Sequence, residues 1–473
     1  MKKFYKVEDI ISNQTKIKKV FFFRICGTGM GAAAALLKDA GYIVEGADND
    51  FYPPMSTYLE NSGIPLKKIS DCTDQYLQEF DLVIVGNVVP NGSNDAIRLE
   101  KLNIPLTSFP QALGGLLLSK KKVVGIAGTH GKTTTTYLSV QVFRNLGIDP
   151  GYLIGGVLPE GESACLGKDD LFFIEADEYD TAYFEKTSKF HHYEINHLIL
   201  TSLEFDHADI FATEKDILNS FDKLFKRKLE KVIICDDYSM TKELIEKYDV
   251  SQIYGEKSNN GPINIKMNSN GSTFDLLIDQ KLEKFSTDLI GIHNILNLSA
   301  IILLAYELDY SLPQIKSSIL HLKMVKRRQE LRGKINQAEI YDDFAHHPTA
   351  VIKTLEGFKK GHPDKKLVVV FEPASSTARS NLFQDRFAGS FDDADVVYII
   401  RPTRPTTVIK GSDLDLDLLK SSLEKKQKIV EIIDTIEQLE LGLNRYSAVD
   451  HVIICLSNGK VLNLFSSPLI QKC

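Results

Sequence analysis

The feature that most constrains the fold is a loop rich in glycine and threonine that follows a short apolar run. The run Val123 to Ala127 leads into Gly128-Thr129-His130-Gly131-Lys132-Thr133-Thr134, and a segment with helical periodicity then extends to about Leu146. A buried strand, a tight glycine turn and a helix in this order are typical of a parallel α/β sheet. The pattern therefore predicts an α/β fold with this loop at the carboxyl end of a strand.

The residues of this loop indicate phosphate binding. Gly128 and Gly131 allow successive backbone N–H groups to turn towards an anion at the start of a helix. Lys132 supplies a cation, and the Thr133 hydroxyl is suited to Mg²⁺. The longer form of the phosphate-loop pattern is not met, because Ile126 stands where its first glycine would be. The alternative is a threonine-rich helix start that binds no ligand. The other members of the predicted loop are Thr129, His130 and Thr134.

Length and composition indicate a globular protein of several domains. A chain of 473 residues exceeds the size of a single core. Further apolar runs, such as Leu367 to Phe371 and Val396 to Ile400, are spaced for another α/β sheet near the C-terminus. We therefore expect three α/β domains, at residues 1–119, 120–325 and 326–473.

Charge and cysteine content narrow the possible partners and location. The net charge of −7, without a basic stripe, argues against nucleic-acid binding. No apolar run reaches the roughly 18 residues of a membrane span, so we expect no membrane association. The six cysteines form no CxxC pair, which suits a reducing cytoplasm.

Two acidic segments follow predicted strands. Glu175, Asp177, Glu178 and Asp180 come directly after the run Leu171 to Ile174. Carboxylates this close repel one another, so a cation or a set of donors is expected among them, unless the segment is a solvated loop. The second segment contains Asp206 and His207. The His207 side chain could bind a metal or phosphate, or it could be structural.

Three further segments combine residues suited to nucleotide chemistry. In Gly291-Ile-His293-Asn294-Ile-Leu-Asn297 the amides could contact an adenine edge, although Asn near a helix start is often a cap. Lys326-Arg327-Arg328 offers cations for a transferring phosphate, or is a solvated surface. Tyr341 to Pro348 places Asp342, Asp343, His346 and His347 in a strand-to-helix turn.

A second glycine turn lies near the N-terminus. The run Val20 to Cys26 leads into Gly27-Thr28-Gly29-Met30-Gly31-Ala32 and a predicted helix from Ala33 to Lys38, and Asp48 follows the next run. This arrangement could bind a dinucleotide, which would make the protein a dehydrogenase. A dehydrogenase has no use for a second phosphate loop, so we favour a different nucleotide ligand. A regulatory ATP-binding module without turnover is a further alternative.

Taken in order, these motifs resemble those of the Mur ligase family over nearly the whole chain. The resemblance implies a Rossmann-like first domain, a central ATPase domain and a Rossmann-like third domain. It also implies an ATP-dependent, Mg²⁺-requiring ligase that forms an amide bond. It assigns catalytic roles to Lys132, Glu175, His207 and Arg327. The implied metal ligands are Thr133, Glu175 and His207. The implied ATP contacts beyond the phosphate loop are His293, Asn294, Asn297, Arg327, Asp343 and His346. The implied UDP-binding residues are Gly27, Thr28, Gly29, Met30, Gly31 and Asp48.

The resemblance also implies substrates. The segments Tyr52 to Thr57 and Leu203 to Phe211 are most similar to the peptidoglycan-recycling branch of the family. Members of that branch join L-Ala-γ-D-Glu-meso-diaminopimelate to UDP-N-acetylmuramate, and L-alanine is the alternative acceptor. We expect a cytoplasmic monomer or weak homodimer. The chain departs from the family at Ser202, where Asn is usual, and at Ala374, where Arg is usual, and Arg379 is a candidate replacement.

Overall fold

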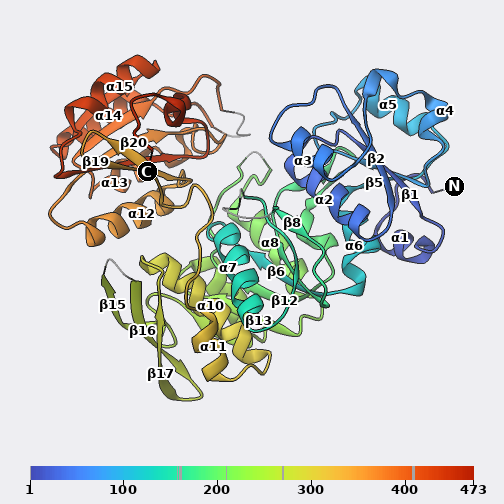
Figure 1. Ribbon diagram of the computed structural model, residues 1–473, viewed down its shortest axis with the longest axis horizontal. Coiled ribbons are helices and arrows are strands. Elements are labelled where there is room, and N and C mark those ends of the chain that lie inside the picture. The colour runs from blue at the N-terminus through green and yellow to red at the C-terminus, as the bar shows by residue number, and fades with distance from the viewer. Residues whose placement is uncertain are drawn as a thin grey trace. The chain divides into compact units, whose positions relative to one another are not determined.

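The computed structural model describes residues 2–156, 158, 162–208, 210–268, 271–406 and 411–472. The chain forms two compact units. The first comprises Met1–Leu203, Leu218–Asn259 and Leu298–Ile319, and the second comprises Glu204–Ile217, Asn260–Asn297 and Leu320–Cys473. Figure 1 shows strands and helices alternating along the chain in both units. The predicted α/β class is confirmed, whereas the boundaries of the three predicted domains stay predictions.

The first unit begins with a sheet of five parallel strands in the order β3-β2-β1-β4-β5. Its strands are β1 (Lys19–Phe23), β2 (Ile43–Asp48), β3 (Leu66–Lys68), β4 (Leu82–Val85) and β5 (Leu106–Ser108). The helices of this region are α1 (Val7–Asn13), α2 (Thr28–Asp39), α3 (Met55–Asn61), α4 (Asp74–Leu77), α5 (Asn94–Lys101) and α6 (Phe109–Leu116). The strands are buried because their residues are almost all apolar, as in β4, whose four residues are all buried.

The predicted start of the first long helix is wrong. Helix α2 begins at Thr28 rather than at Ala33, so most of the glycine turn lies inside the helix. The glycines there allow close packing: a Cβ atom on Gly31 would lie 2.3 Å from the sulfur of Met55 in α3. The sequence pattern suggested a turn because glycine is a poor helix former. In the structure, the glycine at position 31 instead leaves room for α3 to pack against α2.

The first unit also contains a seven-stranded sheet in the order β14-β13-β12-β6-β9-β7-β8. All neighbouring strands are parallel except β7 and β8 at one edge. Its strands are β6 (Lys122–Ala127), β7 (Gly151–Leu153), β8 (Ala164–Cys165), β9 (Leu171–Glu175), β12 (Ile195–Leu200), β13 (Lys231–Cys235) and β14 (Gln252–Tyr254). The associated helices are α7 (Lys132–Asn145), α9 (Ser239–Lys247) and α11 (Leu312–Ser318), while α8 (Glu214–Phe225) and α10 (Ile292–Glu307) have residues in both units. A hairpin of β10 (Asp180–Ala182) and β11 (Glu185–Ser188) follows β9.

The second unit is built on a six-stranded sheet in the order β18-β19-β23-β20-β21-β22. Its strands are β18 (Glu330–Ile335), β19 (Ala338–Asp343), β20 (Lys366–Glu372), β21 (Val396–Ile400), β22 (Ile429–Ile433) and β23 (His451–Ser457), and only β18 is antiparallel to its neighbour. The helices α12 (Pro348–Gly361), α13 (Gln384–Ser390), α14 (Leu416–Lys425) and α15 (Ile436–Arg445) connect these strands. Alternate residues of β20 enter two cores: Val369 packs in one and Val370 in the other. The sheet is therefore covered on both faces.

A three-stranded antiparallel sheet in the second unit was not predicted. It consists of β15 (Ile263–Asn268), β16 (Gly271–Ile278) and β17 (Lys281–Thr287). Among the residues that the structure describes, no helix has the length and apolarity needed to cross a membrane.

Candidate functional site

The predicted phosphate loop lies between β6 and α7 in the first unit. Gly131 has φ of 82° and caps the N-terminus of α7, and Lys132 is the first residue of that helix. The unpaired backbone N–H groups and the dipole of a 14-residue helix favour an anion at this end. The loop thus has the position and backbone geometry of a phosphate site.

Lys132 is held between a carboxylate and a backbone carbonyl. Its ammonium donates to both carboxylate oxygens of Glu178 at 3.0 Å and to the Gly128 carbonyl oxygen at 2.6 Å. The side chains of Lys132 and Glu178 are 14% and 5% exposed. Burial alone would lower the pKa of Lys132, but the Glu178 and Asp177 carboxylates outweigh it and raise the pKa above its usual value. Lys132 therefore remains charged.

Lysine ammonium groups lie among the carboxylates of the acidic segment, as its sequence led us to expect of a cation. Besides Lys132 on Glu178, the Lys189 ammonium lies 2.6 Å from Asp177 and that of Lys186 lies 2.5 Å from Asp180. Three of the four carboxylates of this segment are therefore paired with lysines.

Thr133 and Glu175 form a second polar pair beside the loop. The Thr133 hydroxyl donates to Glu175 Oε2 at 3.1 Å, and the Gly155 N–H donates to Glu175 Oε1 at 2.7 Å. Burial raises the pKa of Glu175 despite these donors and the nearby Lys132. A buried carboxylate whose pKa is raised would gain from a bound cation, and oxygen donors are those that Mg²⁺ prefers. The two side chains therefore fit the predicted metal role.

Ser202 supports the loop, which the sequence analysis did not foresee. Its hydroxyl oxygen accepts from the His130 N–H at 2.8 Å, and its carbonyl oxygen accepts from the Thr129 N–H at 3.3 Å. Ser202 lies just beyond β12, which is adjacent to β6 in the sheet. The sequence showed that Ser202 replaces the Asn usual in the family. Its contact with the loop became evident only from the pairing of β12 with β6.

The other glycine turn of the first unit lies at the carboxyl end of β1. Asp48 at the end of β2 accepts from the Cys26 N–H at 2.8 Å and forms an ion pair with Arg24 at 3.5 Å. The second partner of Arg24 is Asp95, at 2.9 Å. The structure thus brings Asp48 to the predicted turn, where it fixes the backbone that precedes Gly27.

His207 belongs to the second unit, where it is paired with its neighbour in sequence. Its backbone N–H donates to Asp206 Oδ1 at 2.7 Å, and its φ of 55° lies in the left-handed region. Burial would raise the pKa of Asp206, but His207, His347 and His346 outweigh it and hold the pKa well below its usual range. The role of His207 as a metal ligand remains a prediction.

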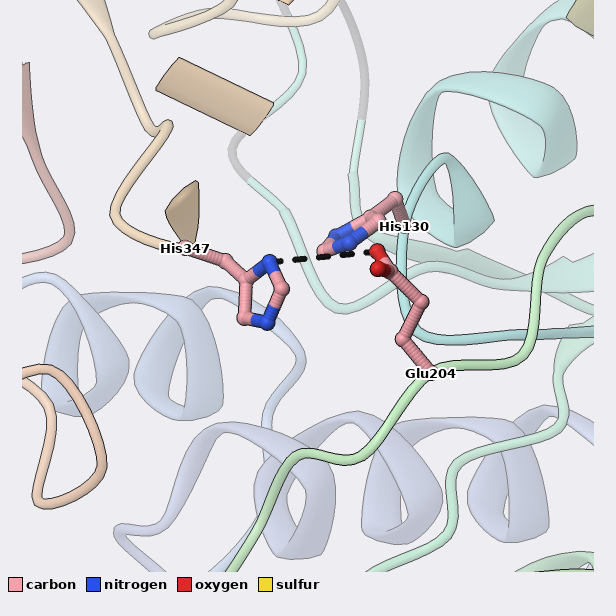
Figure 2. Close-up of side chains that lie close together, drawn as sticks. All are labelled: His130, Glu204 and His347. Carbon is pink, nitrogen blue, oxygen red and sulfur yellow. Dashed lines mark ion pairs between the residues drawn. The ribbon is translucent and has the colours of Figure 1, made fainter. Parts of the chain in front are cut away.

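Glu204 contacts the segment that joins β19 to α12, also in the second unit. Figure 2 shows its carboxylate turned towards the imidazole of His347, with 3.9 Å between Oε2 and Nδ1. The other carboxylate oxygen accepts from the Thr349 hydroxyl at 3.0 Å and from Arg386 at 3.2 Å. His347 is also the N-cap of α12. The predicted strand-to-helix turn is confirmed, and His347 is shown to have a structural role.

The predicted nucleotide residues of the second unit lie in two places. His293, Asn294 and Asn297 lie in the first turns of α10, and the Asn294 amide donates to the Ile290 carbonyl oxygen at 2.8 Å. Asp343 ends β19 and accepts from the backbone N–H groups of Gln329 and Ala345, both at 2.9 Å. The side chain of Gln329 contacts His293, with 3.3 Å between Nε2 of Gln329 and Nε2 of the imidazole. Gln329 therefore connects the two places, which the sequence analysis missed.

His346 and Arg327 are both fixed by contacts within the second unit. His346 Nδ1 lies 2.8 Å from the Phe344 carbonyl oxygen. The Arg327 guanidinium donates to Asp342 Oδ2 at 3.2 Å and to the carbonyl oxygens of Ser457 and Gly459 at 2.8 Å. Arg327 is thus anchored at the carboxyl ends of β19 and β23. Its role at the γ-phosphate remains a prediction.

Asp342 should make stability depend on pH. Burial raises the pKa of Asp342 to about 6, against the lowering effect of Arg327 and Arg332. Because the folded state then binds this proton more tightly than the unfolded state, the stabilisation is full below pH 4 and is lost as pH rises through 6. We expect the free energy of unfolding to fall by roughly 2 kcal/mol relative to Asp342→Asn between pH 4 and 7. Urea unfolding of the wild type and Asp342→Asn across this pH range tests the prediction. If the free energies of unfolding of the two proteins changed in parallel with pH, the prediction would be contradicted.

Comparison with known proteins places these features in a wider group. Three family models match the chain: "Mur ligase family, catalytic domain" over residues 19–121, "Mur ligase middle domain" over 126–305 and "Mur ligase, glutamate ligase domain" over 327–459. UDP-N-acetylmuramate–L-alanyl-γ-D-glutamyl-meso-2,6-diaminoheptandioate ligase of Escherichia coli is 37% identical over 391 residues, which cover 81% of this chain and 85% of the relative. UDP-N-acetylmuramate–L-alanine ligase of Leuconostoc mesenteroides is 31% identical over 386 residues, which cover 81% of this chain and 83% of the relative. The crystal structure of a murein peptide ligase from Psychrobacter arcticus superposes with a TM-score of 0.66 at 29% identity, covering 94% of this chain and 97% of the other.

Proposed function

The chain belongs to the Mur ligase family of ATP-dependent, amide-bond-forming enzymes, and we propose that it joins the tripeptide L-Ala-γ-D-Glu-meso-diaminopimelate to UDP-N-acetylmuramate in peptidoglycan recycling. The observation that carries the proposal is the phosphate loop, where the Lys132 ammonium is held between Glu178 and Gly128. The greater identity to the tripeptide ligase of Escherichia coli than to the L-alanine ligase supports the tripeptide as acceptor.

The proposed reaction has two steps. The muramic acid carboxylate attacks the γ-phosphorus of ATP, which forms an acyl phosphate and releases ADP. The amine of the tripeptide then attacks the acyl carbon, loses a proton and displaces phosphate, so that the amide bond forms. The loop amides and Lys132 would hold the ATP phosphates and offset the charge that builds up during phosphoryl transfer. Arg327 would add a second cation there.

Mg²⁺ fits the oxygen donors of the first unit. The Thr133 hydroxyl lies 3.1 Å from Glu175 Oε2 beside Lys132, and burial raises the pKa of Glu175, so a bound cation would favour its charged form. We infer that these two residues hold the ion, with His207 as a third ligand. When bound, Mg²⁺ would supply positive charge to the phosphate oxygens.

The UDP-linked substrate would bind at the N-terminal sheet. The turn Gly27 to Gly31 at the start of α2 would receive the pyrophosphate, since it presents the N-terminus of a 12-residue helix. Asp48 would contact the nucleoside side. We place the reaction in the bacterial cytoplasm, because it consumes ATP and a nucleotide-linked precursor, and we expect a monomer or weak homodimer.

The proposal is tested by phosphate release from purified protein with ATP, Mg²⁺ and UDP-N-acetylmuramate. We expect release with the tripeptide and little with L-alanine. Release with L-alanine alone would instead identify a ligase of the first step of de novo synthesis. Release that needs no amine acceptor would contradict a ligase altogether.

Arg379 is proposed to bind a carboxylate of the tripeptide. It donates to the carbonyl oxygen of Ala374 at 3.0 Å, and its buried Nε has no partner among the described residues. We expect Arg379→Ala to raise KM for the tripeptide by about tenfold, the value of one charge-assisted hydrogen bond, with KM for ATP unchanged. Steady-state kinetics with each substrate varied in turn measures this. Arg445→Ala, which removes a surface arginine paired with Glu431, is the matched control. An unchanged KM for the tripeptide would reject the proposed role.

A further inference from the structure

A cavity of about 430 Å³ lies in the second unit next to the residues proposed to bind the nucleotide. Its wall includes Tyr341 and Phe358, whose ring centroids are 4.9 Å apart, and residues Ile290 to Ile292. The volume lies within the range of small-molecule sites, and aromatic walls suit a flat ring. Gln329 also lines this cavity.

Gln329 is held in an uncommon backbone conformation by its contacts on both sides. Its φ is 52°, in the left-handed region that non-glycine residues seldom adopt. Its backbone N–H donates to Asp343 Oδ2 at 2.9 Å, while its side-chain Nε2 lies 3.3 Å from His293 Nε2. This conformation directs the amide towards His293, and strain of this kind is often found at functional sites.

The contact with Gln329 determines which nitrogen of His293 carries the proton. With the Gln329 amide nitrogen facing the ring, as the structure places it, this nitrogen donates and His293 Nε2 accepts, which puts the proton on Nδ1. Burial lowers the pKa of His293, which keeps the ring neutral, although Asp343 acts in the opposite direction. Nδ1 is buried and has no hydrogen-bond partner among the described residues. His293 therefore presents a donor that lacks an acceptor.

Asn294, the next residue of α10, carries an acceptor without a partner in the described ranges. Its amide nitrogen donates to the Ile290 carbonyl oxygen, so the orientation of the amide is fixed. Its Oδ1 is buried and, in the part of the chain that the structure describes, has no partner. A donor and an acceptor on adjacent residues match adenine, which has ring-nitrogen acceptors next to the N6 amino donor. Guanine has the O6 acceptor in place of that amino group, so it would face Asn294 Oδ1 with a second acceptor.

We propose that Gln329 is a positioning residue that holds His293 in the Nδ1–H form, so that His293 and Asn294 together select adenine over guanine. The inference rests on the proposed use of ATP, and it adds a residue that determines base selectivity. Gln329 acts through His293 and needs no contact with the reacting atoms.

Nucleotide binding and nitrogen NMR test the proposal independently of ligase turnover. We expect Gln329→Leu to weaken binding of the ATP analogue AMPPNP by about tenfold, the value of one buried hydrogen bond, and to leave GMPPNP binding unchanged. In ¹⁵N-histidine spectra, the His293 signal is assigned as the one that His293→Asn lacks. This signal should show protonated Nδ1 in the wild type and a mixture of tautomers in Gln329→Leu. At saturating ATP, kcat should stay within about twofold, because only binding is affected.

Two further variants separate this role from a structural one. Gln329→Glu places an acceptor against Nε2, so it should favour the Nε2–H form and lose the preference for adenine while the protein stays folded. Gln427→Leu removes an exposed glutamine whose φ is 62°, and it should change neither the spectrum nor the preference. An unaltered ratio of AMPPNP to GMPPNP affinity in both Gln329 variants, or protonated Nε2 in the wild type, would overturn the proposal. Normal AMPPNP binding without turnover would instead contradict the proposed ligase function alone.

Discussion

Replacement of Lys132 by methionine is expected to lower kcat by about a thousandfold, which corresponds to roughly 4 kcal/mol of transition-state stabilisation. Methionine preserves much of the length and apolar volume of the side chain but removes the only charge at its tip. Phosphoryl transfer depends on positioning and on compensation of negative charge, so the loss should affect kcat more than KM for UDP-N-acetylmuramate. Phosphate release measured over hours with a sensitive coupled assay would give the residual rate.

The same substitution should also lower stability. Glu178 is only 5% exposed, and without Lys132 its carboxylate loses the cation that compensates its burial. Removing one partner of a buried ion pair costs about 3 kcal/mol, because the other charge stays buried. Lys122→Met is the control, since Lys122 is 54% exposed and its pair with Glu230 should contribute little. A Lys132→Met protein with kcat within tenfold of the wild type would show that the loop is not the ATP site.

The elements around the phosphate loop could be predicted because their signals are local. The run Val123 to Ala127 is apolar along its whole length, and a glycine turn and a helix follow it directly, so strand, loop and helix were all visible in sequence. In the sheet β15 to β17, β16 alternates between buried and partly buried residues, whereas β15 has mostly exposed residues and lacks an apolar alternation. Periodicity reports burial, and a strand that buries little carries no such signal.

The contacts of the site could be predicted only in part, because many join residues distant in sequence. The sequence indicated that the acidic segment needs cations, but it did not show that Lys189 pairs with Asp177. In the same way, Ser202 contacts the loop only because β12 pairs with β6. Gln329 was not noticed because one glutamine carries no motif, and its importance arises from the left-handed backbone that turns it towards His293.

Gly128→Ala is expected to be among the most damaging single-methyl additions in the chain. Gly128 has φ of 131°, and an added Cβ would lie 2.5 Å from the Thr201 hydroxyl oxygen and 2.7 Å from the Ser202 carbonyl oxygen. The Thr201 side chain can rotate, but the Ser202 backbone just beyond β12 cannot move away from the added atom. We expect a loss of about 3 kcal/mol in the free energy of unfolding, from backbone strain and overpacking together. Nucleotide binding should be lost as well, because Ser202 would be pushed away from the Thr129 and His130 N–H groups that it holds.

Gly147→Ala separates the two parts of this cost. Gly147 also has a positive φ, 93°, but an added Cβ there would meet no atom within 4 Å. That variant should therefore lose only the backbone term, about 1 kcal/mol, and should bind AMPPNP normally. Denaturant unfolding and calorimetric titration of both variants give the comparison. If the two variants lost equal stability, the clash with Thr201 and Ser202 would contribute nothing. If Gly128→Ala still bound AMPPNP as tightly as the wild type, the geometry of the loop would not be what holds the phosphates.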